Sequence, residues 1–322
     1  MAKAGPPSGI DPTDIAQGNW VDRWLPAGTR PYARLARLDR PIGTWLLLLP
    51  CWWGLAYAVS ATGQTLTWLH LWYGVLFGIG AIAMRGAGCT WNDIVDRDID
   101  GKVARTATRP IPSGDVSPWQ AFAFLVFLCL IGLAVLLQFN AAAIWTGIGA
   151  LALVFCYPFM KRITYFPQAW LGLTFNWGVH VGFIAVAGAP DPRQLLLYAA
   201  GFFWTMGYDT IYAHQDKEDD ALIGVKSTAL KFGDATRPWI AGFYVLVMAL
   251  LCAAAWTGGV GAGGVGWGVW ALLALAALHL GWQVRTVDFD GAKSCLHRFR
   301  ANRHFGMIVT AAFVAGAVTV PL

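Results

Sequence analysis

Residues 92–100 read Asn-Asp-Ile-Val-Asp-Arg-Asp-Ile-Asp, so four aspartates fall within nine residues. The stretch directly follows a segment that is apolar enough to lie in a lipid bilayer. On a helix, Asn92, Asp96 and Asp100 are spaced i, i+4 and i+8 and stack along one face. Like charges at this spacing repel unless a cation neutralises them, and oxygen ligands suit Mg²⁺, which binds carboxylates together with substrate phosphate oxygens. A solvated acidic loop is the alternative for this stretch alone.

A second acidic stretch, residues 208–220, reads Tyr-Asp-Thr-Ile-Tyr-Ala-His-Gln-Asp-Lys-Glu-Asp-Asp. Asp216 and Asp220 repeat the i, i+4 spacing, and Asp209 is predicted two helical turns earlier on the same face. Each acidic stretch follows a long apolar segment and precedes a Gly-Asp turn that leads to Ser or Thr and then Pro. The chain therefore contains an internal repeat of membrane helix, acidic loop, turn and membrane helix.

The composition is that of an integral membrane protein. Of the 322 residues, 57% are hydrophobic and only 13% are charged, whereas a soluble protein carries about 25% charged residues. Several windows reach the ~20 apolar residues that span a bilayer. Residues 1–31 are polar and rich in Pro and Gly, and we expect them to be disordered. The six cysteines show no spacing typical of a zinc site or a disulfide framework.

The hydropathy pattern predicts an all-α fold with nine transmembrane helices in a single domain, residues 32–322. The acidic loops are predicted at 91–117 and 214–237. The predicted spans are 45–60, 68–90, 118–138, 141–159, 168–189, 194–213, 238–257, 266–284 and 305–321.

Lys and Arg gather in alternate loops of this map. The loops at 61–67, 139–140 and 258–265 contain none, and the loop at 190–193 contains only Arg193. By the positive-inside rule the basic loops, the N-terminus and both acidic stretches are cytoplasmic, and the C-terminus lies outside. We expect a bacterial inner membrane. The net charge of +5 reflects this topology, so no nucleic-acid partner is predicted.

Carboxylates and basic side chains are thus predicted at one membrane boundary. This mixture suits a diphosphate, because Mg²⁺ bridges carboxylate and phosphate oxygens while Arg and Lys bind the outer oxygens. The sequence contains no G-x-x-x-x-G-K-[ST] motif, which argues against a nucleotide-hydrolysing P-loop. At this boundary the rest of the substrate is expected to be apolar, as in an allylic prenyl diphosphate. Departure of the diphosphate would leave an allyl cation for an electron-rich partner.

The spacings Asn-Asp-x-x-Asp-x-x-x-Asp at 92–100 and Asp-x₆-Asp-x₃-Asp at 209–220 resemble the paired motifs of the UbiA-type intramembrane prenyltransferase family. The resemblance runs from about residue 32 to residue 320. Four more segments are similar to the 4-hydroxybenzoate polyprenyltransferases of that family: 35–45, 100–114, 157–162 and 224–229.

The resemblance implies nine transmembrane helices around a central cavity with a cytoplasmic cap. It implies Mg²⁺-dependent transfer of a polyprenyl group from polyprenyl diphosphate to the carbon ortho to the hydroxyl of 4-hydroxybenzoate, in ubiquinone synthesis. It also implies that Asp209 faces the acceptor as a base or polarising group and that Tyr157 lies near the reacting carbon. The metal ligands carried over are Asn92, Asp96, Asp100, Asp216 and Asp220.

Several basic residues are candidates for substrate binding. Arg37, or its neighbour Arg34, suits the acceptor carboxylate because a planar guanidinium pairs with it bidentately; interfacial anchoring is the alternative. Arg85 lies inside the second predicted span, where charge is usually functional, and a snorkelling arginine is the alternative. The remaining candidates are Arg105, Arg109, Lys161, Arg162 and Lys226.

Other functions compete with this interpretation. A transporter for a phosphorylated solute would place its charged residues at mid-membrane in discontinuous helices, whereas here they cluster at the cytoplasmic ends. A membrane scaffold would not need two acidic stretches with metal-ligand spacing. Among enzymes, prenyltransferases for 1,4-dihydroxy-2-naphthoate, homogentisate or haem remain alternatives, and the segment at 35–45 argues against them by resemblance only.

Overall fold

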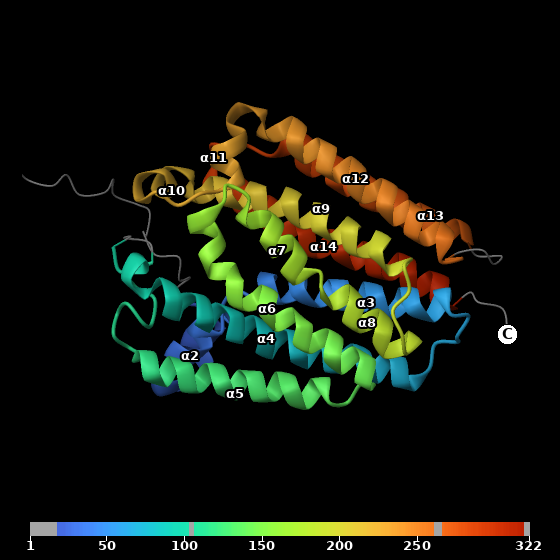
Figure 1. Cartoon of the computed structure of the whole chain (residues 1–322). Helices are drawn as coiled ribbons and strands as arrows, with labels where there is room; N and C mark the ends of the chain where they lie inside the picture. Colours follow the sequence, from blue (N-terminus) through green and yellow to red (C-terminus); the bar gives the residue numbers. More distant parts are fainter. Residues whose placement is uncertain (1–17, 103–105, 261–265, 319–322) are drawn as a thin grey trace, which may run out of the picture. The chain divides into compact units, whose positions relative to one another are not determined.

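The structure is a computed structural model that describes residues 18–102, 106–260 and 266–318. Every regular element in these ranges is a helix, which confirms the predicted all-α class (Figure 1). In chain order the elements are α1 (Trp20–Trp24), η1 (Ala27–Thr29), α2 (Arg30–Leu35), α3 (Ile42–Ala61), α4 (Trp68–Asp100), α5 (Pro118–Leu136), α6 (Ala141–Ile163), α7 (Pro167–Phe175), α8 (Gly178–Ala187), α9 (Gln194–Ala213), η2 (His214–Asp216), α10 (Lys217–Ile223), α11 (Thr228–Phe232), η3 (Gly233–Ala235), α12 (Thr236–Thr257), α13 (Gly266–Thr286) and α14 (Ala292–Val318).

Seven helical stretches within the described ranges are long and apolar enough to cross a membrane. The chain is therefore an integral membrane protein. The other two predicted spans fall on α9 and on the second half of α14, up to the last described residue at 318. Helix α9 carries Asp209 and is less apolar, whereas the described part of α14 joins a basic first half to a short apolar second half. The seven stretches are Ile42–Ala61, Trp68–Asp100, Pro118–Leu136, Ala141–Ile163, Pro167–Ala187, Thr228–Thr257 and Gly266–Thr286.

The chain divides into two compact units, and the first contains the described residues of Met1–Pro41 and Arg85–Cys129. Its small apolar core consists of Leu35, Ile111, Val116 and Ala121. Residues 18–31 belong to the segment that we expected to be disordered, but α1 forms there. The Asn19 side chain accepts a hydrogen bond from the amide of Val21, the second residue of α1, and caps this helix. The disorder prediction for residues 1–17 falls outside the described part of the chain.

The second unit contains the described residues of Ile42–Met84 and Leu130–Leu322. Within it α3 packs on α8 and α14, and α9 packs on α12 (Figure 1). Aromatic side chains fill its centre: the ring of Trp204 lies 4.9 Å from that of Trp53 and 5.3 Å from that of Phe305. All three side chains are fully buried. Large apolar contacts therefore hold the middle of α9, before the turns that carry Asp209.

The predicted span at 168–189 is broken in the middle. Helix α7 ends at Phe175 and α8 begins at Gly178. The buried Asn176 between them donates from Nδ2 to the carbonyl oxygen of Gly172 and to Thr205 Oγ1, both at 2.8 Å. A polar side chain thus binds main-chain and side-chain oxygens at the break, which is how broken helices are tolerated at membrane depth.

Both acidic stretches are more helical than the loops that we predicted. Residues 92–100 are the last turns of α4, which continues past the end of its apolar part. The second stretch begins on α9 and continues through η2 and α10. Hydropathy marks where the apolar segment ends, but the helix extends further because its backbone hydrogen bonds do not depend on side-chain polarity.

The contact between α3 and α8 depends on glycines. A Cβ added at Gly182 would overlap the carbonyl oxygen of Cys51, and one added at Gly54 would overlap that of Val179. Small residues at such crossings let helix backbones approach closely in lipid.

We expect Gly182→Ala to lower the thermal unfolding temperature of the detergent-solubilised protein. The added methyl group forces α3 and α8 apart, which costs about 1–3 kcal/mol. Gly281→Ala on α13 is the matched control, because no neighbouring atom lies within 4 Å of the added Cβ. Size-exclusion chromatography after heating measures the change, and equal melting of both variants would contradict this packing.

Candidate active site

The end of α4 carries the first group of carboxylates. Asp93 and Asp96 have no exposed surface, and Asp100 is 6% exposed. Asn92 is half-buried, whereas the Asp98 side chain is 84% exposed. The structure therefore separates one outward aspartate from three inward ones, as expected for helical periodicity.

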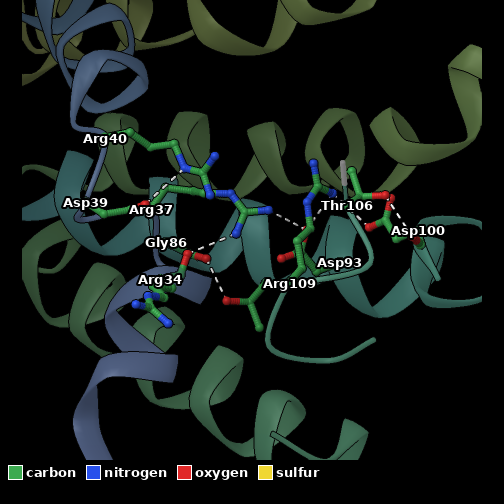
Figure 2. A network of polar contacts seen from close by, with 10 residues as sticks. Arg34, Arg37, Asp39, Arg40, Gly86, Asp93, Asp100, Thr106 and Arg109 are labelled. Carbon is green, nitrogen blue, oxygen red and sulfur yellow. Dashed lines mark hydrogen bonds and ion pairs between the residues drawn. The ribbon is translucent and has the colours of Figure 1, made fainter. Parts of the chain in front are cut away.

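Arginines from the flanking segments bind these carboxylates (Figure 2). Arg37, in the turn after α2, donates from Nη2 to Asp93 Oδ1 at 2.7 Å. Arg109, in the turns between α4 and α5, donates from Nη1 to Asp100 Oδ2 at 2.8 Å and to Asp93 Oδ1 at 3.4 Å. Thr106 Oγ1 donates to the main-chain carbonyl of Asp100 at 2.8 Å and ties this segment to the end of α4. Arg37 and Arg109 are thus brought to the first acidic stretch, and their contact with substrate stays a prediction.

Asp93 is the buried aspartate of this group for which the sequence predicted no role. It precedes Asp96 by three residues and Asp100 by seven, a spacing that places all three on one helical face. This periodicity was the available signal for its burial. Its arginine partners were not predictable in the same way, because Arg37 is 56 residues away in the sequence.

The basic candidate on α4 itself is Arg85, which is half-buried. It lies about two turns before Asn92, as predicted. Arg105 falls outside the described residues. Tyr157 is half-buried on α6, one residue before Pro158, which is buried inside that helix.

Asp209 is half-buried on the last turns of α9, beside the fully buried Tyr208. The next residue, Thr210, shares a 2.7 Å hydrogen bond with Thr228 Oγ1. The amide nitrogen of Thr228 donates to Gln168 Oε1 at 3.1 Å. Buried polar contacts therefore link the end of α9 to α7 and α11.

The predicted common face of Asp209, Asp216 and Asp220 assumed one continuous α-helix. That assumption is wrong, because α9 ends at Ala213 and η2 is a 3₁₀ turn before α10 begins at Lys217. A 3₁₀ turn has fewer residues per turn and shifts the register. The backbones of Asp216 and Asp220 are helical, and their side chains lie outside the described part of the chain.

His214 at this junction is buried. Its Nδ1 lies 2.9 Å from the main-chain carbonyl oxygen of Thr210. Burial lowers the pKa of His214 below its ordinary value of 6.5, because the imidazolium loses its hydration. His214 is thus neutral at physiological pH, in contact with the backbone of α9.

The three basic candidates of the second unit lie at the C-terminal end of α6. The amide nitrogen of Lys226 donates to the carbonyl oxygen of Lys161 at 3.0 Å, and its Nζ donates to that of Ile163 at 3.1 Å. The ammonium also lies 5.5 Å from the ring centre of Tyr165. Arg162 is exposed in the same last turn. Lys226 thus caps a helix end where cations are favoured, and its binding to substrate stays a prediction.

The donor set at the end of α4 fits Mg²⁺. Two nearly unexposed carboxylates, Asp96 and Asp100, lie one helical turn apart beside the amide of Asn92. Within the described ranges no group of three or more His, Cys, Asp or Glu side chains is arranged to hold a metal ion. In proteins, Mg²⁺ is usually held by one or two carboxylates together with substrate phosphate oxygens.

Comparison with known proteins places the chain among prenyltransferases. The UbiA prenyltransferase family matches residues 47–311. The mitochondrial 4-hydroxybenzoate polyprenyltransferase of Arabidopsis thaliana is 47% identical over 94% of this chain and 72% of its own length, and that of Homo sapiens is 49% identical over 90% and 76%. The 4-hydroxybenzoate geranyltransferase 1 of Lithospermum erythrorhizon is 45% identical over 93% of this chain and 94% of its own.

Solved structures share the fold. A UbiA homolog from Aeropyrum pernix K1, in its apo form, superposes with a TM-score of 0.65 and 26% identity over 84% of this chain and 96% of that chain. A UbiA homolog from Archaeoglobus fulgidus bound to GPP and Mg²⁺ superposes with a TM-score of 0.58 and 18% identity over 90% and 99%. On the family match and the identity over nine-tenths of its length, this chain belongs to the UbiA prenyltransferase family.

Proposed function

We propose that this protein is a Mg²⁺-dependent 4-hydroxybenzoate polyprenyltransferase of ubiquinone biosynthesis. It transfers a polyprenyl group from polyprenyl diphosphate to the ring carbon ortho to the hydroxyl of 4-hydroxybenzoate. The observation that carries the proposal is the 49% identity over 90% of this chain to a protein of that name. The buried carboxylates at the end of α4 support it, because they provide oxygen ligands next to an apolar span.

The two acidic stretches each supply ligands for Mg²⁺ in this proposal. Asn92, Asp96 and Asp100 come from the first stretch, and Asp216 and Asp220 from the second. When bound, the metal ion neutralises charge on the departing diphosphate. The basic residues bind the outer diphosphate oxygens as charge-assisted donors; they are Arg85, Arg105, Arg109, Lys161, Arg162 and Lys226. Arg37 remains the candidate for the acceptor carboxylate.

Asp209 is the proposed base. The allylic C–O bond breaks and its electron pair leaves with the diphosphate, while the ortho carbon forms a new C–C bond to the prenyl group. Asp209 accepts a hydrogen bond or the proton from the 4-hydroxyl and so raises electron density at that carbon. The ortho carbon then gives its proton to the released diphosphate, and Asp209 returns any proton it took to the oxygen, which restores the aromatic phenol. Tyr157 is proposed to lie near the reacting carbon.

Acceptor choice tests this function. Purified protein is supplied with geranyl diphosphate, Mg²⁺ and one of three acceptors: 4-hydroxybenzoate, 1,4-dihydroxy-2-naphthoate or homogentisate. We expect prenylated product from 4-hydroxybenzoate at a rate at least about tenfold above the others, since a site built for one set of polar groups discriminates strongly against acceptors that lack it. Faster transfer to either of the other acceptors would contradict the assignment.

The proposed arrangement of the protein in the membrane is the one predicted from the sequence. It is a single domain over residues 32–322, with nine transmembrane helices around a central cavity and a cytoplasmic cap. The proposed location is the bacterial inner membrane. The N-terminus and both acidic stretches are cytoplasmic and the C-terminus lies outside, according to the distribution of Lys and Arg.

Cysteine labelling tests this topology. Ser113 and Gln64 are both exposed and lie in different turns, before α5 and before α4. On intact cells we expect a membrane-impermeant maleimide to label Gln64→Cys but not Ser113→Cys, with both labelled after lysis. The unsubstituted protein gives the background labelling, which should be low because its six cysteines are half-buried or buried. Labelling of Ser113→Cys from outside would reverse the proposed orientation.

A further inference from the structure

Asp93 is a buried charge that the proposed function leaves unused. Its side chain has no exposed surface. Oδ1 receives a 2.7 Å hydrogen bond from Arg37 and a 3.4 Å hydrogen bond from Arg109 (Figure 2). A carboxylate buried in this way requires cationic partners. The chain thus maintains a charged pair at the end of a membrane helix, where an apolar pair would avoid the desolvation of two ions.

The backbone at Arg37 is adapted to this contact. Its φ of +55° makes it the one non-glycine residue with positive φ in the described ranges. The amide of Leu38 donates to the carbonyl oxygen of Ala33 at 2.9 Å, so Arg37 occupies the position after a helix where glycine is favoured. Arg37 Nη1 also donates to the carbonyl oxygen of Arg34 at 2.9 Å. A strained residue that bears a functional side chain points to a role for that side chain.

The approach of α2 and α4 fixes the distance between Arg37 and Asp93. A Cβ at Gly86, two helical turns before Asp93, would lie 3.0 Å from the Cβ of Ala36. A larger side chain at position 86 would press against Ala36 and also against Leu128 Cδ1, likewise 3.0 Å away. The contact between Arg37 and Asp93 thus lies next to a closely packed crossing of α2 and α4.

Arg109 connects Asp93 to a proposed metal ligand. A single nitrogen, Nη1, donates to Asp100 Oδ2 at 2.8 Å and to Asp93 Oδ1 at 3.4 Å. The second oxygen of Asp93, Oδ2, is buried and has no hydrogen-bond partner within the described residues. Asp93 therefore holds a spare acceptor beside the guanidinium that neutralises Asp100.

We propose that Asp93 is a positioning residue for Arg109 and not a metal ligand. Before the metal binds, Arg109 provides the positive charge at Asp100. When Asp100 turns to Mg²⁺ and diphosphate, Asp93 retains the guanidinium through its spare oxygen, so that Arg109 stays next to the diphosphate as a donor. Arg37 holds Asp93 in place throughout. This inference rests on the proposed function of Asp100 and Arg109.

The number of bound metal ions separates positioning from ligation. Mn²⁺ bound in the presence of geranyl diphosphate is counted by electron paramagnetic resonance for the full-length wild type, Asp93→Asn, Asp96→Asn and Asp98→Asn. We expect Asp93→Asn to bind as many ions as wild type at saturating Mn²⁺ and Asp96→Asn to bind fewer. Turnover of Asp93→Asn should fall about 10–100-fold, as when a partner that orients a metal-site residue is removed. The exposed Asp98 is the matched control, and its variant should match wild type in both measurements.

A loss of bound Mn²⁺ in Asp93→Asn equal to that in Asp96→Asn would overturn the proposal and make Asp93 a ligand. Unchanged turnover would overturn it as well. If Asp93→Asn does not fold, the double variant Arg37→Met/Asp93→Leu tests the proposal in its place. Apolar residues at both positions replace the buried ion pair without leaving one of its two charges unpaired.

The double variant distinguishes positioning from a structural role alone. We expect it to elute as a monodisperse species and to bind the wild-type number of Mn²⁺ ions, while its KM for geranyl diphosphate rises about tenfold or more. A double variant with a wild-type KM for geranyl diphosphate would show that the pair only stabilises the fold. Turnover is not used for this variant, because Arg37 is also the candidate for the acceptor carboxylate. The number of bound Mn²⁺ ions does not depend on the acceptor, so this measurement tests the role of Asp93 separately from the proposed function. A wild-type protein that binds Mn²⁺ and geranyl diphosphate but transfers nothing to 4-hydroxybenzoate would overturn the proposed function and not the role of Asp93.

Discussion

Asp96→Ala should reduce prenyl transfer by about a thousandfold or more. Asp96 is a carboxylate without exposed surface at the end of α4, and its proposed role is to hold the metal that stabilises the departing diphosphate. Losing a leaving-group stabiliser costs several kcal/mol of transition-state energy, and about 4 kcal/mol corresponds to a thousandfold in rate. Asp216→Ala should cause a comparable loss, because neither acidic stretch alone neutralises a diphosphate trianion. Initial rates at saturating substrates measure both effects.

The exposed Asp98 provides the control for Asp96. It lies on the same turns of α4 with its side chain in solvent, 3.5 Å from the Arg97 guanidinium, and such surface pairs contribute little. Asp98→Ala should therefore keep near-normal turnover. Normal turnover in Asp96→Ala or Asp216→Ala, or full wild-type activity in excess EDTA, would contradict the metal assignment.

Asp209→Asn should separate binding from chemistry. Asp209 lies in the last turns of α9, seven residues before Asp216, and the 3₁₀ turn η2 begins between them. The proposal therefore places Asp209 away from the metal and next to the acceptor. The variant should bind prenyl diphosphate with near-normal affinity but lose C–C bond formation by about 10²–10⁴-fold, the range typical of a lost general base. The allyl cation would then be captured by water to give prenyl alcohol.

Two measurements check this prediction. Calorimetry gives the affinity for prenyl diphosphate with Mg²⁺, and chromatography gives the ratio of prenylated 4-hydroxybenzoate to prenyl alcohol. Asn has nearly the same shape as Asp, so the contacts around Thr210 and Tyr208 should persist. A collapse of diphosphate affinity in Asp209→Asn would mean that Asp209 is a metal ligand and that the roles along this segment are not separate.

Much of the fold followed from local pattern. Apolar stretches predicted a helix at each of the nine positions, because an unbroken apolar run has few other stable conformations in lipid. The i, i+4 spacing at 92–100 indicated a helical acidic face, and α4 includes these residues. The break near Asn176 and the 3₁₀ turn after Ala213 were missed. The 3₁₀ turn contains no Pro or Gly that would have marked a helix end, whereas Gly178 follows directly after the break at Asn176.

The site was less accessible from the sequence, because it depends on contacts between distant residues. The motif indicated Asp96 and Asp100 as ligands, but nothing local paired Arg37 with Asp93 or Arg109 with Asp100. Arg37 and Arg109 were read as substrate-binding residues from their charge and position. The structure adds that both already contact carboxylates of the first acidic stretch. A basic residue near an acidic motif therefore has two possible partners, and only the fold shows which one it contacts.

The proposed reaction joins a prenyl group to 4-hydroxybenzoate by a C–C bond and depends on a metal ion. Mass spectrometry and NMR of the product from purified protein, geranyl diphosphate and 4-hydroxybenzoate test it most directly, with Mg²⁺ present or removed by EDTA. We predict one product with the geranyl group on the carbon ortho to the hydroxyl, formed with Mg²⁺ and absent with EDTA. An O-linked product, transfer that persists in EDTA, or no transfer by folded protein that binds both substrates would contradict the account.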